Sequence, residues 1–170
     1  MVNITKEFIA DRLANKYKKE AIAEGQDEGL FVFRPNGEKP KKTLHSVYYL
    51  NIDNCVRELV KENNIKNGII ICSSKHTTSS IYVNHFEKGL LFDLNQTLEA
   101  SYPAKKKYQH NLWDDVYKNA DAHLKAIHLG KSVSILVKDG ELVLGDFENI
   151  IYAEFDERPG KSFSVTLLGE

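Results

Sequence analysis

The chain has 170 residues, a hydrophobic fraction of 42% and a charged fraction of 28%, which is typical of one globular domain rather than a disordered protein. Its net charge of −1 argues against a protein that coats nucleic acid or an anionic membrane, because such partners select for a clustered positive surface. Lys105, Lys106 and Lys107 form the only tight basic run, which indicates a solvated loop.

The expected compartment is the cytoplasm. No stretch approaches the roughly 20 apolar residues of a membrane span, and the first residues lack the pattern of a signal peptide. Cys55 and Cys72 lie in apolar runs, where buried and reduced thiols are expected.

The N-terminal segment predicts a helix followed by a hairpin. Apolar residues including Ile4, Phe8 and Leu13 recur at helical spacing, which predicts a helix over residues 4–23. Residues 30–33 and 43–50 predict two strands, with turn residues at positions 35–37 between them. We expect residues 1–34 to be an appended helix and strand, and residues 35–170 to form the main part of one compact unit.

The middle of the chain alternates helices and strands. Asp53 is the expected N-cap of a helix that turns Val56, Leu59 and Val60 inward. Residues 68–72 are β-branched and apolar, which predicts a buried central strand. A helix over 88–100 and a long loop over 104–118 follow.

The C-terminal part predicts an antiparallel meander after one short helix. Asn119 can cap a helix that ends at Gly130. Strands are expected over 132–138, 141–144, 147–155 and 161–168, with a tight turn at Asp139-Gly140. Helices set between runs of strands predict an α+β fold with a largely antiparallel sheet.

His76 lies in an unusual polar run that directly follows the predicted central strand. If that strand continues, Ser74, His76, Thr78 and Ser80 share one face. An imidazole among hydroxyls can bind an anion or a metal. The alternative is an edge strand with a hydrated face.

His123 and Asp93 are polar residues on predicted apolar helix faces. His123 shares helical phase with Ala120, Leu124 and Ile127, although a lone inward histidine is usually a hydrogen-bonded core residue. Asp93 lies among leucines, where a buried carboxylate needs a partner and can act as a base or orient a histidine. An exposed position at the margin of the face remains the alternative.

His110 lies in the long loop, where a histidine alone is weak support for a site. HExxH, CxxC, P-loop and GxSxG patterns are absent from the sequence, so zincin, Walker-type and serine-hydrolase assignments lack support.

Several motifs in register make residues 68–170 resemble the YjbQ family, small proteins often labelled secondary thiamine-phosphate synthase. The matching pieces are His76-Thr77-Thr78, Asn84, Asp93-Leu94, Tyr108-Gln109-His110, Asp121-Ala122-His123-Leu124-Lys125, Leu129-Gly130, Gly140-Glu141-Leu142, Leu144-Gly145 and Leu168-Gly169-Glu170.

The resemblance implies a two-sheet, largely antiparallel β-sandwich with flanking helices, here with an extra N-terminal helix. It also implies a homotrimer with sites near subunit contacts, and a pocket of three histidines that holds a metal such as zinc in some members. Neutral imidazoles suit zinc, and three ligands leave a position for water or substrate.

The chain departs from the family pattern at three places. His85 stands where the family usually has an acidic residue, and Gly145-Asp146-Phe147-Glu148 replaces its Gly-Thr-Trp-Gln signature. The basic residues near the last strand are reduced to Arg158 and Lys161.

The resulting hypothesis is an enzyme-like site for a small molecule, with a phosphorylated metabolite as the candidate. The expected metal ligands are His76, His110 and His123. The expected catalytic residues are His76, His123 and Asp93, with Asp93 as a base or supporting group. The expected phosphate- or cofactor-binding residues are Thr77, Thr78 and Asn84.

The resemblance implies coupling of a pyrimidine diphosphate to a thiazole phosphate, as a main or a side activity. The alternatives are a metal- or metabolite-binding protein without turnover and a metal-dependent phosphoester hydrolase.

Overall fold

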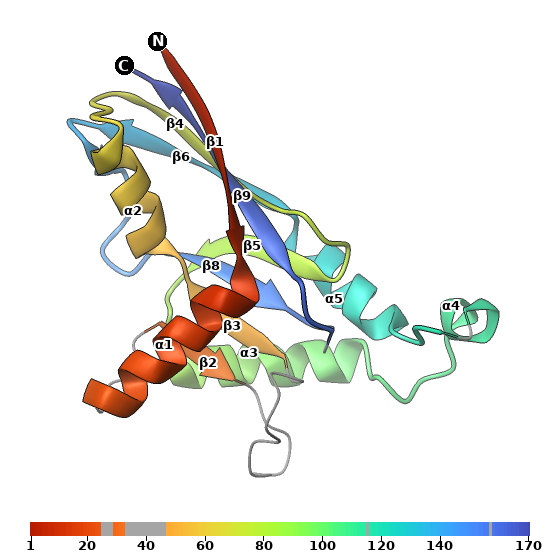
Figure 1. Ribbon diagram of the computed structural model, residues 1–170. Helices are drawn as coiled ribbons and strands as arrows, with labels where there is room; N and C mark the ends of the chain where they lie inside the picture. Colours follow the sequence, from red (N-terminus) through yellow and green to blue (C-terminus); the bar gives the residue numbers. More distant parts are fainter. Residues whose placement is uncertain (25–28, 33–46, 115, 157) are drawn as a thin grey trace.

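The computed structural model describes residues 1–24, 29–32, 47–114, 116–156 and 158–170, and Figure 1 shows their arrangement. The helices are α1 (Ala10–Glu24), α2 (Asp53–Glu62), α3 (Lys88–Ser101), α4 (Gln109–Trp113) and α5 (Ala120–Leu129). The strands are β1 (Val2–Ile9), β2 (Leu30–Val32), β3 (Tyr48–Asn51), β4 (Gly68–Ser74), β5 (Ser79–Asn84), β6 (Ser132–Lys138), β7 (Glu141–Leu142), β8 (Asn149–Glu154) and β9 (Ser162–Gly169).

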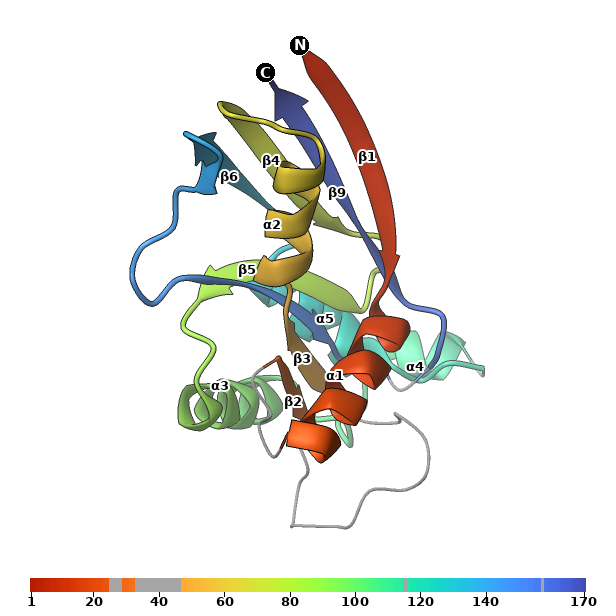
Figure 2. The same ribbon diagram turned by 60° about the vertical axis from the view of Figure 1, so that its left-hand side comes forward.

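The strands form two antiparallel sheets, which confirms the α+β, two-sheet prediction. One sheet has the order β1-β9-β4-β6-β7 and the other has the order β2-β3-β8-β5. The main hydrophobic core draws on strands of both sheets and on α1 and α2. A second core joins the four-stranded sheet to α3 and α5, and Figures 1 and 2 show α3 alongside that sheet.

Strand β8 belongs to both cores because successive side chains of a strand point to opposite faces. Ile150 and Tyr152 enter the main core, whereas Ile151 and Ala153 enter the second one. All four side chains are fully buried. Since a buried large aliphatic side chain contributes about 1.5–3 kcal/mol, this strand stabilises both layers.

The first half of the predicted helix over residues 4–23 is wrong, because Val2–Ile9 is a strand. It pairs with β9 over its whole length, from Val2 opposite Gly169 to Ile9 opposite Ser162. Val2, Ile4 and Phe8 are partly buried and follow the period of two that is typical of a strand. Their spacing is also compatible with a helix, which is why the strand was not predicted. The helix begins only at Ala10.

The predicted boundary at residue 34 and the turn at positions 35–37 lie outside the described residues, as does the start of the strand predicted over 43–50. On the N-terminal side of that boundary, β1 is an edge of the five-stranded sheet and β2 pairs with β3. The described N-terminal residues are therefore part of both sheets.

Asp53 is the first residue of α2, so its predicted role as N-cap is wrong. Ile52 occupies the N-cap position without a side-chain hydrogen bond. The Asp53 carboxylate instead accepts hydrogen bonds from the Ile150 backbone N–H (2.7 Å) and the Asn149 side chain (2.8 Å). It thereby joins α2 to β8.

Other local predictions are confirmed. Helix α3 ends at Ser101 before Tyr102, and Gly130 ends α5 with a φ of +92°, a conformation that glycine adopts readily. Asp139 and Gly140 both have positive φ in the β6–β7 turn, as a type I′ turn requires. Among the described helices, none is long and apolar enough to cross a membrane.

Candidate functional site

The connection between the two sheets forms one wall of the candidate site. The chain leaves the five-stranded sheet at Ser74 and enters the other at Ser79, so the strand does not continue through this region and the condition for one shared face is not met. The Ser74 hydroxyl donates to the His76 carbonyl (3.1 Å) and accepts from the His76 N–H (3.2 Å). The buried hydroxyl therefore satisfies the backbone of a turn, and this turn presents His76 and Thr77 outward.

A cavity of about 330 Å³ lies beside this turn. Its lining comes from the turn, from the segment before and at the start of α5, and from the segment between β8 and β9. The lining residues are His76, Thr77, Thr78, Asp114, Tyr117, Asn119, His123, Asp156, Arg158, Pro159 and Lys161. We call this cavity the histidine pocket.

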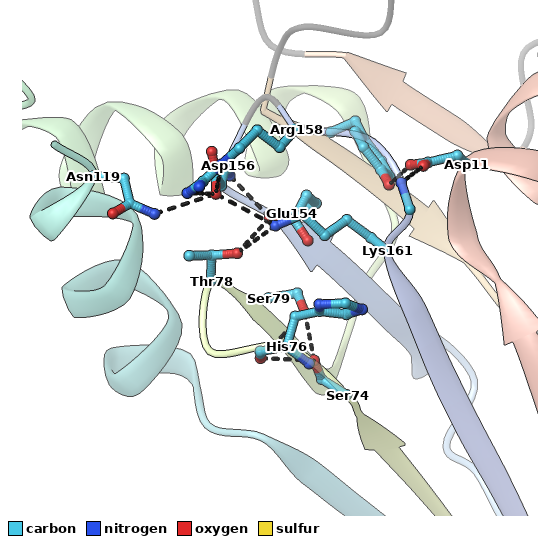
Figure 3. A network of polar contacts seen from close by, with 12 residues as sticks. Asp11, Ser74, His76, Thr78, Ser79, Asn119, Glu154, Asp156, Arg158 and Lys161 are labelled. Atoms are coloured by element: carbon cyan, nitrogen blue, oxygen red, sulfur yellow. Dashed lines mark hydrogen bonds and ion pairs between the residues drawn. The ribbon is translucent and has the colours of Figure 1, made fainter. Parts of the chain in front are cut away.

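A buried ion pair lies against one wall of the histidine pocket (Figure 3). The Lys161 ammonium group donates to the Thr78 hydroxyl (2.8 Å) and lies 3.4 Å from Glu154 Oε1. Thr78 donates in turn to Glu154 (2.9 Å), and Tyr152 donates to the other carboxylate oxygen (3.0 Å). Burial raises the pKa of Glu154, and the positive charge of Lys161 opposes that rise.

Asp156 links the cations of the pocket to α5. Its Oδ2 accepts hydrogen bonds from Arg158 Nε (2.9 Å) and from the Asn119 amide (3.2 Å). Partial burial acts to raise the pKa of Asp156, but the Arg158 hydrogen bond and the charge of Lys161 outweigh it and lower the pKa. Arg158 also lies 3.8 Å from the centre of the Tyr117 ring.

His110 of α4 and His123 of α5 are adjacent, and His123 lines the histidine pocket whereas His110 is not among its lining residues. Their ring centroids are 5.1 Å apart and their planes are nearly perpendicular, at 82°. His110 Nε2 lies 3.2 Å from Asn119 Oδ1. Partial burial and the proximity of His110 lower the pKa of His123, against the effect of a hydrogen bond to the Thr77 backbone. The neutral imidazole is therefore favoured.

The inward stripe predicted for α5 is only partly correct. Ala120 is buried as predicted, but the other buried residues are Ala122, Lys125 and Ala126, and Ile127 is 74% exposed. Lys125 faces inward because Asp121 and Glu99 form ion pairs with it. His123 lies off this buried side and lines the pocket instead.

His76 lies on the opposite side of the pocket from Asn119, and its ring is directed toward the segment that leads into β9 (Figure 3). Its Nε2 is 3.5 Å from the Ser162 hydroxyl. Partial burial, followed by the charge of Lys161, lowers the pKa of His76. Within the described part of the chain, no three His, Cys, Asp or Glu side chains are grouped closely enough to hold a metal ion.

Asp93 and Asn84 lie in a separate hollow of about 220 Å³, at the other end of β5. Its other lining residues are Tyr82, His85, Leu90, Leu91, Leu94 and Thr97. Since β5 has six residues and a strand rises about 3.3 Å per residue, the two cavities are separated by roughly 15–20 Å along it. Leu91, Asn95 and Leu98 take the buried positions of α3 and leave Asp93 exposed. The structure therefore does not bring Asp93 or Asn84 to the histidine pocket within this chain.

The sequence interpretation missed Glu154 and Asp156. A signal for Glu154 was present, because it shares strand parity with Ile150 and Tyr152, which are core residues. A carboxylate on the apolar face of a strand needs a buried partner. No comparable signal marked Asp156, which lies beyond the strand.

Comparison with known proteins agrees with this architecture. The chain is 34% identical over 142 residues to a UPF0047 protein of Methanothermobacter thermautotrophicus, covering 84% of this chain and 97% of that one. It is 37% identical over 115 residues to a UPF0047 protein of Archaeoglobus fulgidus, covering 68% and 86%.

Solved structures of similar fold extend the match to the N-terminal residues. A YbjQ-like protein of unknown function from Sulfolobus solfataricus superimposes with a TM-score of 0.71 at 25% identity, covering 99% of both chains. A YjbQ/UPF0047 protein of Clostridium acetobutylicum gives a TM-score of 0.65 at 24% identity, covering 82% of this chain and 97% of that one. The family model described as UPF0047 protein YjbQ-like matches residues 41–170, and the chain belongs to this family.

Proposed function

We propose that the histidine pocket binds a small phosphorylated metabolite together with a divalent metal, with zinc as the candidate. The main support is that the adjacent His110–His123 pair lies beside a cavity whose other walls carry Arg158 and Lys161. Imidazoles can ligate a metal, and fixed cations can bind phosphate oxygens. The protein would then act on this metabolite as an enzyme.

The His110–His123 pair would supply two neighbouring imidazoles to a metal ion, since their ring centroids are 5.1 Å apart and imidazole nitrogen is an ordinary zinc ligand. His76 would complete the set only after its side chain turns from Ser162 toward the pocket. A bound zinc ion supplies a Lewis acid and lowers the pKa of a bound water.

The cations of the pocket differ in their availability to a phosphate group. Lys161 is 8% exposed and faces two carboxylates, whereas Arg158 is 39% exposed. Arg158 is therefore the proposed phosphate contact, and Lys161 is the fixed charge behind it. Thr77, in the exposed turn, adds a hydroxyl and a backbone N–H on the opposite wall.

The reaction to assay first is the coupling of a pyrimidine diphosphate to a thiazole phosphate, which the family resemblance suggests. That coupling would form a bond to the thiazole nitrogen and release diphosphate, and in this proposal the imidazole of His76, which stays outside the metal-binding pair, exchanges a proton with the leaving diphosphate. The metal-dependent hydrolase alternative uses the same pocket, so a panel of phosphoesters assayed with and without a chelator separates the two reactions.

We also propose that the protein is a cytoplasmic homotrimer with this pocket near a subunit contact. Leu112, Trp113 and Val116 lie within five consecutive positions and are 61%, 83% and 77% exposed. Exposed apolar side chains gathered in one region are typical of a contact surface. Sedimentation velocity of the purified protein tests the trimer, since a monomer at micromolar concentration contradicts it.

The metal proposal is tested by isothermal titration calorimetry with zinc, using the metal-free protein. We expect one site per chain, and an affinity loss of more than about a hundredfold in His123→Ala, since even the loss of an outer partner of a ligand costs 10–100-fold. Asp93→Asn is the matched control, because its side chain lies in the other hollow. Equal zinc affinity in the wild type and His123→Ala contradicts the proposal, as does coupling activity that persists in His123→Ala.

A further inference from the structure

A short chain of polar contacts connects the N-terminal strand to the histidine pocket. The Ser162 hydroxyl donates a hydrogen bond to Glu7 Oε1 (2.7 Å), and the Ser162 hydroxyl oxygen also lies 3.5 Å from His76 Nε2. Glu7 belongs to β1, which precedes the region matched by the family model. Ser162 is the first residue of β9 and is 8% exposed.

The strand register explains why these side chains meet. Glu7 is opposite Ser164 in the β1–β9 ladder, and Ser162 is two residues along the same strand. Glu7 and Ser162 therefore lie on the same face of the sheet as diagonal neighbours. Ser162 also accepts, at its backbone carbonyl, a hydrogen bond from the Lys75 N–H (3.1 Å), next to His76. The turn that presents His76 is thus attached to β9 at this residue.

The number of hydrogens on each group determines which group donates and which accepts in these two contacts. A serine hydroxyl has one hydrogen, and an ionised carboxylate can only accept. Ser162 gives its hydrogen to Glu7 and must therefore accept at its contact with His76. The hydrogen of that contact belongs to Nε2 of the imidazole. In a neutral ring the free lone pair is then on Nδ1.

We infer that Glu7, acting through Ser162, is a positioning residue that holds His76 in the Nε2–H tautomer and leaves Nδ1 as its proton-accepting atom while the ring contacts Ser162. Glu7 contacts neither the cavity nor a reacting group, so it is not a catalytic residue. The inference rests on the proposed function only for the task given to Nδ1.

A second N-terminal carboxylate supports this role of β1 and α1. Asp11 accepts a hydrogen bond from the Gly160 N–H (2.6 Å) and another from the Tyr48 hydroxyl (2.9 Å), and the Ala10 N–H donates to the Lys161 carbonyl (2.9 Å). Gly160 has a φ of +87°. Figure 3 shows Asp11 beside the segment between β8 and β9 that carries Arg158 and Lys161. The segment carrying Arg158 and Lys161 is therefore fixed by the same N-terminal residues.

The test is the tautomer ratio of His76, measured from imidazole ¹⁵N chemical shifts in the full-length, metal-free protein at a pH where the ring is neutral. We expect the Nε2–H form to dominate in the wild type and in Glu7→Gln, whose amide oxygen still accepts. In Glu7→Leu the freed serine hydrogen can turn to Nε2, and the ratio should fall about fivefold, the effect of one ordinary hydrogen bond.

Two further variants make the result decisive. Ser162→Ala removes the link and should also shift the ratio, whereas Asn3→Leu, an exposed substitution on the same face of β1, should leave it unchanged. An unchanged ratio in both Glu7→Leu and Ser162→Ala overturns the inference, and a shift in Ser162→Ala alone overturns the role of Glu7. Because no metal or substrate is present, the result is independent of the outcome of the zinc titration.

Discussion

Charged and polar side chains lie at both ends of β5, but they are buried at one end and exposed at the other. At its Ser79 end, Lys161 and Glu154 are almost fully buried and are hydrogen bonded through Thr78. At its Asn84 end, Asp93 and Asn84 are exposed beside leucines of α3. The difference shows that, at the two ends of β5, the charged side chains are fixed where a group of opposite charge from another segment meets them.

The largest expected effect comes from removing the buried cation. Lys161→Met leaves Glu154 and Asp156 without their shared ammonium group, and breaking a buried pair in this way costs about 3–5 kcal/mol. Urea denaturation measures the change. Lys6→Met, which removes an ion pair whose partners are 47% and 60% exposed, should cost less than about 1 kcal/mol. An equal loss of unfolding free energy in the two variants would show that the buried ion pair contributes no more to stability than the exposed one.

A smaller effect concerns the pH dependence of stability. Because the pKa of Glu154 is raised in the folded protein, the folded state keeps this proton longer than the unfolded state. Its contribution is fully present below the unfolded pKa of about 4.5 and is lost as pH rises through the folded pKa.

Glu154→Gln removes this contribution. Relative to the wild type, the free energy of unfolding of Glu154→Gln should therefore rise between pH 4.5 and pH 7, as measured by urea denaturation at several pH values. A difference that is constant over this range would mean that Glu154 titrates alike in both states.

The smallest effect is expected at the other end of β5. Asp93→Asn changes one exposed carboxylate, so the free energy of unfolding should stay within about 0.5 kcal/mol of the wild-type value. Thermal and urea denaturation measure this change. A loss above 1 kcal/mol would show that Asp93 has a buried partner in the assembled protein.

Much of the fold could be predicted because its signals are local. The boundaries of α3, the β-branched strand β4 and the Asp139-Gly140 turn each follow from residues close together in the sequence. The strand at Val2–Ile9 could not be recognised in this way, because its partner β9 lies about 160 residues away. Its alternation was also masked by apolar residues that continue into α1.

The candidate site was predictable in part. The sequence pointed to His76 and His123, and both line the histidine pocket. The face of α5 predicted to turn His123 inward is not its buried face, because the burial of Lys125 depends on Glu99 of α3, which no period within α5 reveals. Likewise, the polar run after β4 could not show that Ser74 and Thr78 serve a turn and a buried ion pair.

The pairing of β1 with β9 has a consequence for the order of events during synthesis. Val2 lies opposite Gly169, and Figure 1 shows the two ends of the chain side by side. A ribosome adding about 5–20 residues per second needs roughly 8–30 s to add the residues between β1 and β9, and β1 cannot pair with β9 before that time has passed. Contacts of such sequence separation also slow folding. The hydrogen bond between Glu7 and Ser162, and with it the contact to His76, therefore forms only after β9 has been made.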